Sequence, residues 1–296
     1  MQGRFFEMKR SWLSSILAAA MGLCMMMTLM PASASAAGSA INVLLIGVDS
    51  AAKDQRGRSD TMMLVRVDPE NGMIRMASFL RDLYVNVPGV GKTRLNAAYH
   101  YGGEALLKET IATNFEVSID RTVTVGFSLL CDLVDEIGGI EVEITEKEVP
   151  HFNDTVRDYN ADYGLTGGAV KEAGIHRLDG KQALCFSRMR KLDNDFKRTS
   201  RQQMVISALL TRMSQMSRWE LLRIALKNLN RVETDLTFGE VASLAPMLAK
   251  LSEMDIQAAH VPFEGAYSDE TVNGMMVLVP NLTVCRSKLV DFLKGS

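Results

Sequence analysis

Residues 41–49 read Ile-Asn-Val-Leu-Leu-Ile-Gly-Val-Asp, an apolar run that ends in a glycine, a valine and an acidic residue. A short run this rich in branched residues is typical of a fully buried β-strand. Residues 61–67 and 73–79 have a similar character, and the turn sequence Asp-Pro-Glu-Asn-Gly at 68–72 joins them. We therefore predict three consecutive strands, the first of which spans 41–47.

Charged side chains flank all three predicted strands. Asp49 follows the first strand, Arg58 and Asp60 stand at the start of the second, and Arg81 and Asp82 follow the third. In an antiparallel meander the exit of one strand lies beside the entry of the next, which gathers all five groups at one end of the sheet. Taken singly, such residues are usually surface charges. Because ligands bind at strand ends, the five together favour a binding site.

Two carboxylates beside several arginines suit a divalent cation and a phosphorylated ligand. Mg²⁺ is usually held by one or two carboxylates together with substrate phosphates. The planar guanidinium group of arginine binds phosphate oxygens through two parallel hydrogen bonds. The carboxylates and arginines at this end of the sheet are therefore candidates for metal and phosphate binding.

A second basic cluster lies further along the chain and consists of Arg188, Arg190, Lys191, Arg198 and Arg201, followed by Gln202 and Gln203. We predict a strand at 184–187, which would place Arg188 and Arg190 on one face. A helix predicted at 199–214 would place Arg198 and Arg201 on one face. The alternative is a solvated basic surface, which is our interpretation of Lys191.

The rest of the chain alternates between helical and strand patterns. We predict helices at 103–115, 130–137, 218–230, 238–252 and 282–294, strands at 122–127, 140–144 and 256–262, and a polar surface loop at 150–175. Mixed strands and helices throughout indicate one α/β domain over residues 41–296, with helices on both faces of a sheet.

Several function classes are disfavoured. Gly89-Val90-Gly91-Lys92-Thr93 resembles the end of a P-loop, but the first glycine of that motif is replaced by Asn86. The four histidines have no zinc-ligand spacing, and there is no Gly-x-Ser-x-Gly sequence. The four cysteines form no Cys-x-x-Cys pair, which favours free thiols. The net charge of −2 and the lack of aromatic residues among the arginines argue against nucleic-acid binding.

The N-terminal segment, residues 1–40, has the pattern of an export signal. Arg4, Lys9 and Arg10 precede an apolar run over 12–30, and small residues follow it. The run is long enough to span a bilayer. A retained anchor would give a cell-membrane protein with an extracytoplasmic domain, and a cleaved signal would give a secreted one.

The chain resembles the LytR-CpsA-Psr family of cell-wall glycopolymer transferases. The resemblance runs in family order from about residue 41 to 215 and rests on Val43–Asp49, Arg58–Thr61, Arg81-Asp82, Leu95–Tyr99 with Gly102-Gly103, Val134–Ile140, Leu178–Ala183, Ser187–Lys191 and Asp195–Gln203. The family implies a three-layer α/β/α sandwich with a mixed central sheet and an apolar tunnel for a polyprenyl chain. We expect the helices at 103–115 and 127–137 to line that tunnel.

The resemblance also implies roles for single residues. It marks Asp49 and Asp60 as ligands of Mg²⁺ (or Mn²⁺) and Asp82 as a further carboxylate of the site. It assigns pyrophosphate binding to Arg58, Arg81, Arg188, Arg190, Arg198 and Arg201, with Gln202 nearby. Two positions depart from the family pattern: Leu80 replaces a proline, and Arg94 replaces a lysine while keeping its charge. We include Arg94 in the pyrophosphate-binding set.

The implied reaction joins a glycopolymer, such as teichoic acid or a capsule polymer, to peptidoglycan in cell-wall assembly. A sugar hydroxyl attacks the sugar-proximal phosphorus of a polyprenyl-pyrophosphate carrier, and Asp82 or Asp60 takes the proton. Arg81, Arg190 and Mg²⁺ stabilise charge on the transferring group. Two alternatives are a non-catalytic regulatory module that binds lipid pyrophosphate and a pyrophosphatase that uses water in place of the sugar.

Overall fold

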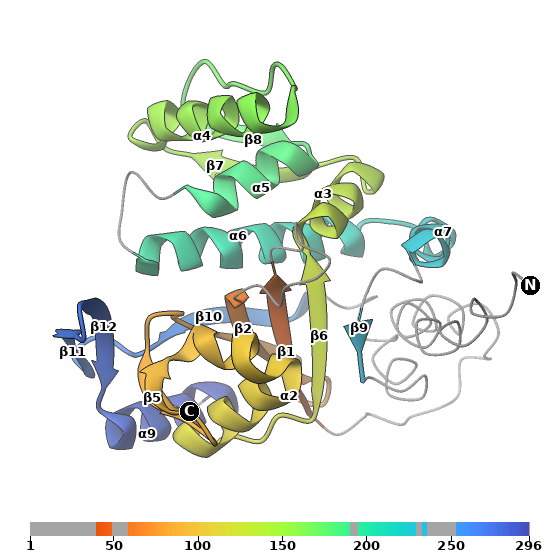
Figure 1. Ribbon diagram of the computed structural model, residues 1–296. Helices are drawn as coiled ribbons and strands as arrows, with labels where there is room; N and C mark the ends of the chain where they lie inside the picture. Colours follow the sequence, from red (N-terminus) through yellow and green to blue (C-terminus); the bar gives the residue numbers. More distant parts are fainter. Residues whose placement is uncertain (1–39, 49–58, 190–194, 229–232, 236–252, 296) are drawn as a thin grey trace, which may run out of the picture.

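The computed structural model describes residues 40–48, 59–189, 195–228, 233–235 and 253–295, and its architecture is a layered α/β fold (Figure 1). Within these residues, six strands form a mixed central sheet in the order β10-β3-β2-β1-β6-β9. The strands are β1 (Ile41–Val48), β2 (Ser59–Asp68), β3 (Met73–Phe79), β6 (Arg121–Gly126), β9 (Glu233–Thr234) and β10 (Asp255–Val261).

The first three strands form the antiparallel meander that the sequence predicts. β1 pairs antiparallel with β2, and β2 pairs antiparallel with β3. β6 and β10 add to β1 and β3 in parallel, which makes the sheet mixed. Gly47 permits the close approach of β1 to β2, because a Cβ atom at this position would lie only 2.8 Å from Cβ of Thr61.

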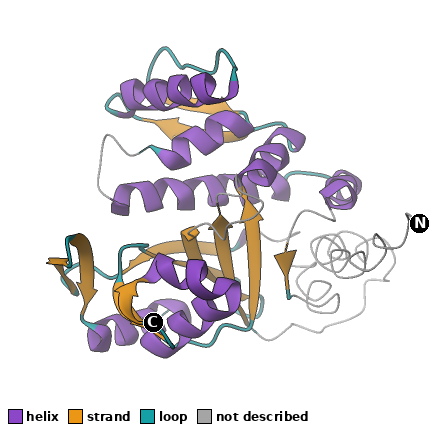
Figure 2. Cartoon of the chain, viewed as in Figure 1, coloured by secondary structure: helices purple, strands orange, loops and turns teal. Residues whose placement is uncertain are grey.

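Helices cover both faces of the sheet (Figures 1 and 2), as the predicted three-layer sandwich requires. On one face Leu44, Ile46, Met62 and Leu64 pack against α2 (Leu95–Phe115) and α9 (Leu282–Lys294). On the other face Met63 and Val65 pack against Ile206 and Leu210 of α6 (Asp195–Ser214). Because both faces of the sheet are covered, side chains on both sides of each strand are buried, and the strands read as continuous apolar runs.

A further group of elements packs around α6. It contains α3 (Phe127–Glu136), β7 (Ile140–Ile144), α4 (Glu148–Tyr163), β8 (Gly174–Leu178), α5 (Gly180–Arg188) and α7 (Arg218–Asn228). These elements share an apolar cluster that includes Val134, Phe152, Phe186 and Val205. Two hairpins, β4 (Tyr84–Val87) with β5 (Gly91–Arg94) and β11 (Tyr267–Val272) with β12 (Met275–Pro280), complete the described chain.

Two predictions about local structure are wrong. Residues 150–175 do not form a mere surface loop, because α4 occupies 148–163 and buries Phe152 and Val156. Glu148 accepts hydrogen bonds from the backbone N–H and the hydroxyl of Thr145, and this Thr-x-x-Glu pattern is the start signal that the prediction overlooked.

Residues 184–187 belong to helix α5, not to a strand. A capping box at its start, in which Asp179 and Gln182 bond each other's backbone N–H groups, overrides the short apolar run. Arg188 therefore ends a helix. The helix predicted at 103–115 is the second part of α2, which is interrupted at Gly103, where φ is 66°. The helix predicted at 238–252 lies outside the described residues.

No helix among the residues that the structure describes is long and apolar enough to cross a membrane. The apolar N-terminal run at 12–30, which the sequence marks as a signal or anchor, lies outside the described residues.

Candidate active site

Arg81 is the centre of a network of charges at one end of the sheet. It follows β3, and its guanidinium group lies 3.2 Å from the carboxylate of Asp60, which is the second residue of β2. The same group lies 3.6 Å from Asp82 and 3.4 Å from Asp195. The meander thus brings Asp60, Arg81 and Asp82 together, as predicted. All four side chains remain about one-fifth exposed and accessible to a ligand.

The predicted set did not include Asp195. This residue opens α6, and its carboxylate also lies 2.8 Å from Arg198, one helical turn later. Burial raises the pKa of Asp195 above its usual value, although Arg198 and Arg81 act against the shift. The sequence signal was present, since an acidic residue three positions before an arginine at a helix start is a common local ion pair.

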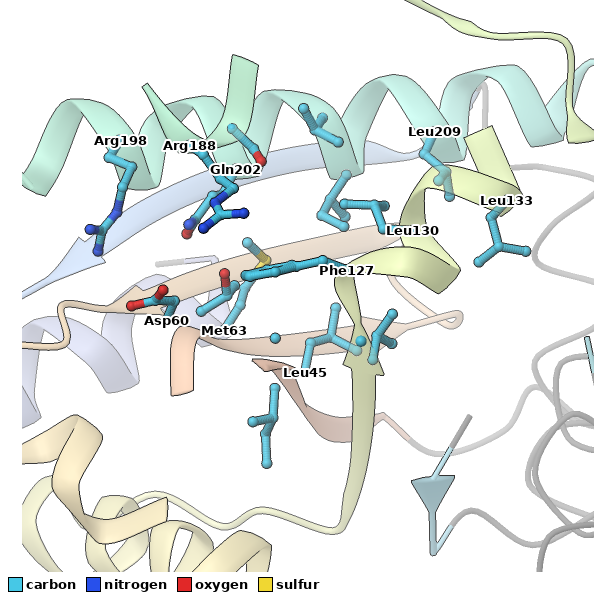
Figure 3. A pocket seen from close by; sticks show the side chains of 18 residues that line it. Leu45, Asp60, Met63, Phe127, Leu130, Leu133, Arg188, Arg198, Gln202 and Leu209 are labelled. Carbon is cyan, nitrogen blue, oxygen red and sulfur yellow. The ribbon is translucent and has the colours of Figure 1, made fainter. Parts of the chain in front are cut away.

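An apolar cavity of about 200 Å³ begins beside this network (Figure 3). Its polar end is formed by Asp60 from β2, Arg188 at the end of α5, and Arg198 and Gln202 from α6. Figure 3 shows Arg188, Arg198 and Gln202 on one side of the cavity and Asp60 on the other. The guanidinium of Arg188 also stacks over the ring of Phe127, at 5.1 Å from its centroid.

The rest of the cavity is lined by apolar side chains and runs away from the charged groups between the sheet and helices α3 and α6 (Figure 3). Leu45 and Met63 come from the sheet, Leu130 and Leu133 from α3, and Leu209 from α6. The prediction that helix 127–137 lines a cavity is thus confirmed. The prediction for helix 103–115 is wrong, because α2 packs on the opposite face of the sheet.

Arg201 has a different environment from Arg198, although both belong to α6. Only 3% of its side chain is exposed, and its Nε lies 2.9 Å from the carboxylate of Glu148. It also donates a hydrogen bond to the carbonyl oxygen of Met189. Arg201 does not line the cavity, so the structure gives it a structural ion pair where the sequence suggested phosphate binding.

Arg94 also has partners within the protein. Its Nε lies 3.2 Å from Asp82, and its Nη2 donates a 2.6 Å hydrogen bond to the carbonyl oxygen of Met276 in β12. The side chain therefore links the Asp82 loop to the β11–β12 hairpin. Among the described residues, Arg81, Arg188 and Arg198 remain the arginines that line a cavity at this site.

The described residues supply few possible ligands for a metal ion at this site. No group of three or more histidine, cysteine or acidic residues within the described ranges is arranged to hold a metal. Among the described residues that line the apolar cavity, Asp60 supplies a carboxylate, and a Mg²⁺ ion needs only one or two carboxylates besides phosphates. Val48, the last residue of β1, pairs with Ser59. Asp49, Arg58 and Arg190, which were also predicted for the site, lie outside the described residues.

We expect Glu148→Ala to destabilise the protein by about 3 kcal/mol, because the buried Arg201 would lose its carboxylate partner. Burial tends to raise the pKa of Glu148, but hydrogen bonds from Arg201 and Thr145 outweigh it and hold the pKa below the usual value of 4.5. The contribution of this carboxylate is therefore complete above pH 4.5 and is lost as the pH falls through the lower folded-state value.

Urea unfolding at pH 7 and at pH 3 measures both effects. The matched control is Glu141→Ala, which removes an exposed ion pair with Arg177 and should change stability by less than about 1 kcal/mol. Equal losses for the two variants would refute a structural role for the Glu148–Arg201 pair.

Comparisons with known proteins find a matching family and similar structures. The profile of the LytR_cpsA_psr family matches residues 27–287. The polyisoprenyl-teichoic acid–peptidoglycan teichoic acid transferase TagV of Bacillus subtilis strain 168 is 34% identical over 233 residues, which cover 76% of this chain and 57% of TagV. The regulatory protein MsrR of Staphylococcus aureus strain COL is 28% identical over 86% of this chain and 74% of its own length.

A solved structure of TagT with bound octaprenyl pyrophosphate is also similar. It matches with a TM-score of 0.65 and 23% identity, covering 89% of this chain and 95% of that one. This chain thus spans little more than half the length of TagV, while it shares its fold with nearly all of the TagT structure.

Proposed function

Because this chain belongs to the LytR_cpsA_psr family, we propose that it transfers a glycopolymer from a polyprenyl-pyrophosphate carrier to a hydroxyl group of a peptidoglycan sugar. The product is a phosphodiester. The relative TagV is named for the transfer of teichoic acid to peptidoglycan, and the similar structure of TagT holds octaprenyl pyrophosphate.

The observation that carries the proposal is the division of the cavity into a charged end and an apolar length. Arg188, Arg198 and Gln202 at one end can donate hydrogen bonds to phosphate oxygens. The remaining wall offers almost only apolar side chains, which suit a chain that has no polar group to pair. A cavity of about 200 Å³ holds the isoprene units nearest the pyrophosphate, and the rest of the carrier extends beyond it.

In the proposed reaction the arginines bind and orient the pyrophosphate and stabilise the charge that develops on the transferring and leaving oxygens. Asp82 or Asp195 accepts the proton of the attacking hydroxyl. Asp82 is held in place by Arg81 and Arg94. Burial raises the pKa of Asp195, and a raised pKa makes a carboxylate a better proton acceptor.

The proposal includes Mg²⁺ or Mn²⁺ as a cofactor. Asp60 would hold the ion together with the phosphates of the substrate, and Asp49 is the second ligand that the family resemblance implies. When bound, such an ion neutralises phosphate charge and polarises the phosphorus–oxygen bonds. Without it, the carboxylates near the arginines would repel a pyrophosphate.

We also propose an extracytoplasmic location at the cell membrane. The support is the sequence pattern of residues 1–40, in which basic residues precede an apolar run. A retained N-terminal anchor would place the catalytic domain next to a carrier lipid in the same membrane.

A direct test combines purified protein, Mg²⁺, a polyprenyl-pyrophosphate-linked sugar and peptidoglycan oligomers, with mass spectrometry of the products. A phosphodiester-linked product supports the transferase. Release of a sugar phosphate without linkage would point to a pyrophosphatase. Tight lipid binding without any turnover would point to a binding or regulatory module.

The apolar length of the cavity makes a separate prediction. Leu130→Trp places a larger side chain in the wall of the cavity, so we expect affinity for polyprenyl pyrophosphate to fall by about tenfold or more. Binding of inorganic pyrophosphate should stay unchanged, because the charged end is untouched. Leu165→Trp, at an exposed position that is not part of the cavity wall, is the control. Equal lipid affinity in all three proteins would show that the tail lies elsewhere.

A further inference from the structure

A second, larger cavity of about 520 Å³ opens beside the Arg81 network and is lined partly by the same charged groups. Arg81, Asp82, Asp195 and Arg198 form one wall, and the β11–β12 hairpin forms the other. Arg198 lines this cleft and the apolar cavity alike. The reacting groups thus lie where the two spaces meet.

The hairpin is attached to the Asp82 loop by hydrogen bonds. The backbone N–H of Leu278 in β12 donates to the carbonyl oxygen of Asp82 at 3.0 Å, and Arg94 bonds both the Asp82 carboxylate and Met276. Leu83 and Leu278 also form an isolated parallel bridge. The position of the hairpin relative to Asp82 is therefore fixed, and a ligand that contacts the hairpin would be positioned relative to Asp82 as well.

The hairpin face toward the cleft carries side chains that suit a sugar chain. Tyr267, Asp269 and Thr271 alternate along β11, so they project from the same face of the strand. The ring of Tyr267 lies 5.4 Å from that of Phe196, which also lines the cleft. Aromatic faces pack against the C–H groups of a sugar ring, while carboxylate and hydroxyl groups bond sugar hydroxyls.

The distribution of charge in the cleft distinguishes between an anionic lipid pyrophosphate and a neutral sugar chain. On one wall the carboxylates of Asp82 and Asp195 pair with the guanidinium groups of Arg81 and Arg198, and on the hairpin wall Asp269 adds a further carboxylate. Asp269 is exposed, and its carboxylate makes no hydrogen bond or ion pair with any residue that the structure describes. The hairpin wall of the cleft therefore disfavours anionic groups and can accept hydrogen bonds from sugar hydroxyls, whereas Arg81 and Arg198 lie on the opposite wall.

We propose that this cleft binds the acceptor of the reaction, a peptidoglycan sugar chain without phosphate, and directs one of its hydroxyl groups toward the Arg81 network. The inference rests on the proposed transferase function. The hydroxyl oxygen forms a bond to the sugar-proximal phosphorus, and the bond from that phosphorus to the oxygen of the departing polyprenyl phosphate breaks. The hydroxyl proton passes to Asp82 or Asp195. The lipid and the acceptor then approach the phosphorus from different spaces, as an in-line displacement requires.

The test is direct binding by calorimetry with two separate probes. One is an uncrosslinked oligomer of alternating N-acetylglucosamine and N-acetylmuramic acid, with the lactyl carboxylates converted to amides so that the chain is neutral, and the other is polyprenyl pyrophosphate. For Asp269→Arg and Tyr267→Ala we expect the oligomer Kd to rise by about tenfold or more. The Kd for polyprenyl pyrophosphate should stay within about twofold of wild type, which also shows that the variants are folded.

The matched control is Glu143→Arg, which reverses an exposed charge on strand β7 outside the cleft and should change neither Kd. An unchanged oligomer Kd in the Asp269 and Tyr267 variants, or no oligomer binding to the wild type, would overturn the proposal. So would weaker binding of a sugar-bearing donor lipid in Asp269→Arg, since the cleft would then hold the donor sugar. Oligomer binding that depends on Asp269, in a protein that forms no phosphodiester, would support the cleft and refute only the transferase function.

Discussion

Replacing Arg81 with lysine is expected to lower kcat/KM for transfer by about 100- to 1000-fold, equivalent to about 3–4 kcal/mol of transition-state stabilisation. One guanidinium group lies within 3.2–3.6 Å of the carboxylates of Asp60, Asp82 and Asp195. The planar fork can contact several oxygens at once, whereas an ammonium group is a single point of charge on a flexible stem. The substitution keeps the positive charge and removes the planar arrangement of hydrogen-bond donors.

Steady-state kinetics with the lipid-linked donor and the peptidoglycan oligomer measure this effect. Arg177→Lys is the matched control, because Arg177 forms an exposed pair with Glu141 away from both cavities at the Arg81 network. We expect no change for it. If Arg81→Lys retains more than about half of the wild-type kcat/KM, the network around Arg81 does not act in the reaction.

Asp60→Ala is expected to reduce transfer by at least about 1000-fold and to abolish its dependence on added Mg²⁺. Asp60 is the described carboxylate that faces the polar end of the apolar cavity, and it also pairs with Arg81. Its loss would remove a ligand of the proposed metal and would leave Arg81 with two of its three carboxylate partners. Both effects would weaken the binding of the transferring phosphoryl group.

Mn²⁺ binding measured by electron paramagnetic resonance, in the presence of polyprenyl pyrophosphate, separates metal binding from activity. We expect Asp60→Ala to lose the bound Mn²⁺ signal and Asp154→Ala, which removes an exposed ion pair with Arg157, to keep it. Transfer that continues after chelation of all divalent metal would refute the metal assignment. A full Mn²⁺ signal in Asp60→Ala would place the ion on other ligands.

Much of the site was predictable because Asp60, Arg81 and Asp82 lie next to strands that follow one another directly in the sequence. The apolar runs of β1, β2 and β3 and the turn at 68–72 specify an antiparallel meander, and the meander brings Asp60, Arg81 and Asp82 together. The two wrong secondary-structure predictions concern segments in which a helix-start signal and the local amino-acid composition indicated different structures. α5 begins with a capping box, and at the start of α4 the Glu148 carboxylate accepts hydrogen bonds from Thr145. These signals were outweighed by a short apolar run in the first case and by polar residues in the second.

The sequence by itself determined the family, the sheet order of the first three strands and the presence of an arginine-rich, carboxylate-containing site. Only the tertiary structure decided which of these charges lie at the cavity. Arg198 and Arg201 lie three positions apart on one helix, and a helical pattern places them on one face. Arg198 pairs with Asp195 beside the cavity, whereas Arg201 is buried against Glu148, which is 53 positions away. Whether an arginine meets a ligand or a buried carboxylate depends on long-range packing, and no local pattern contains that information.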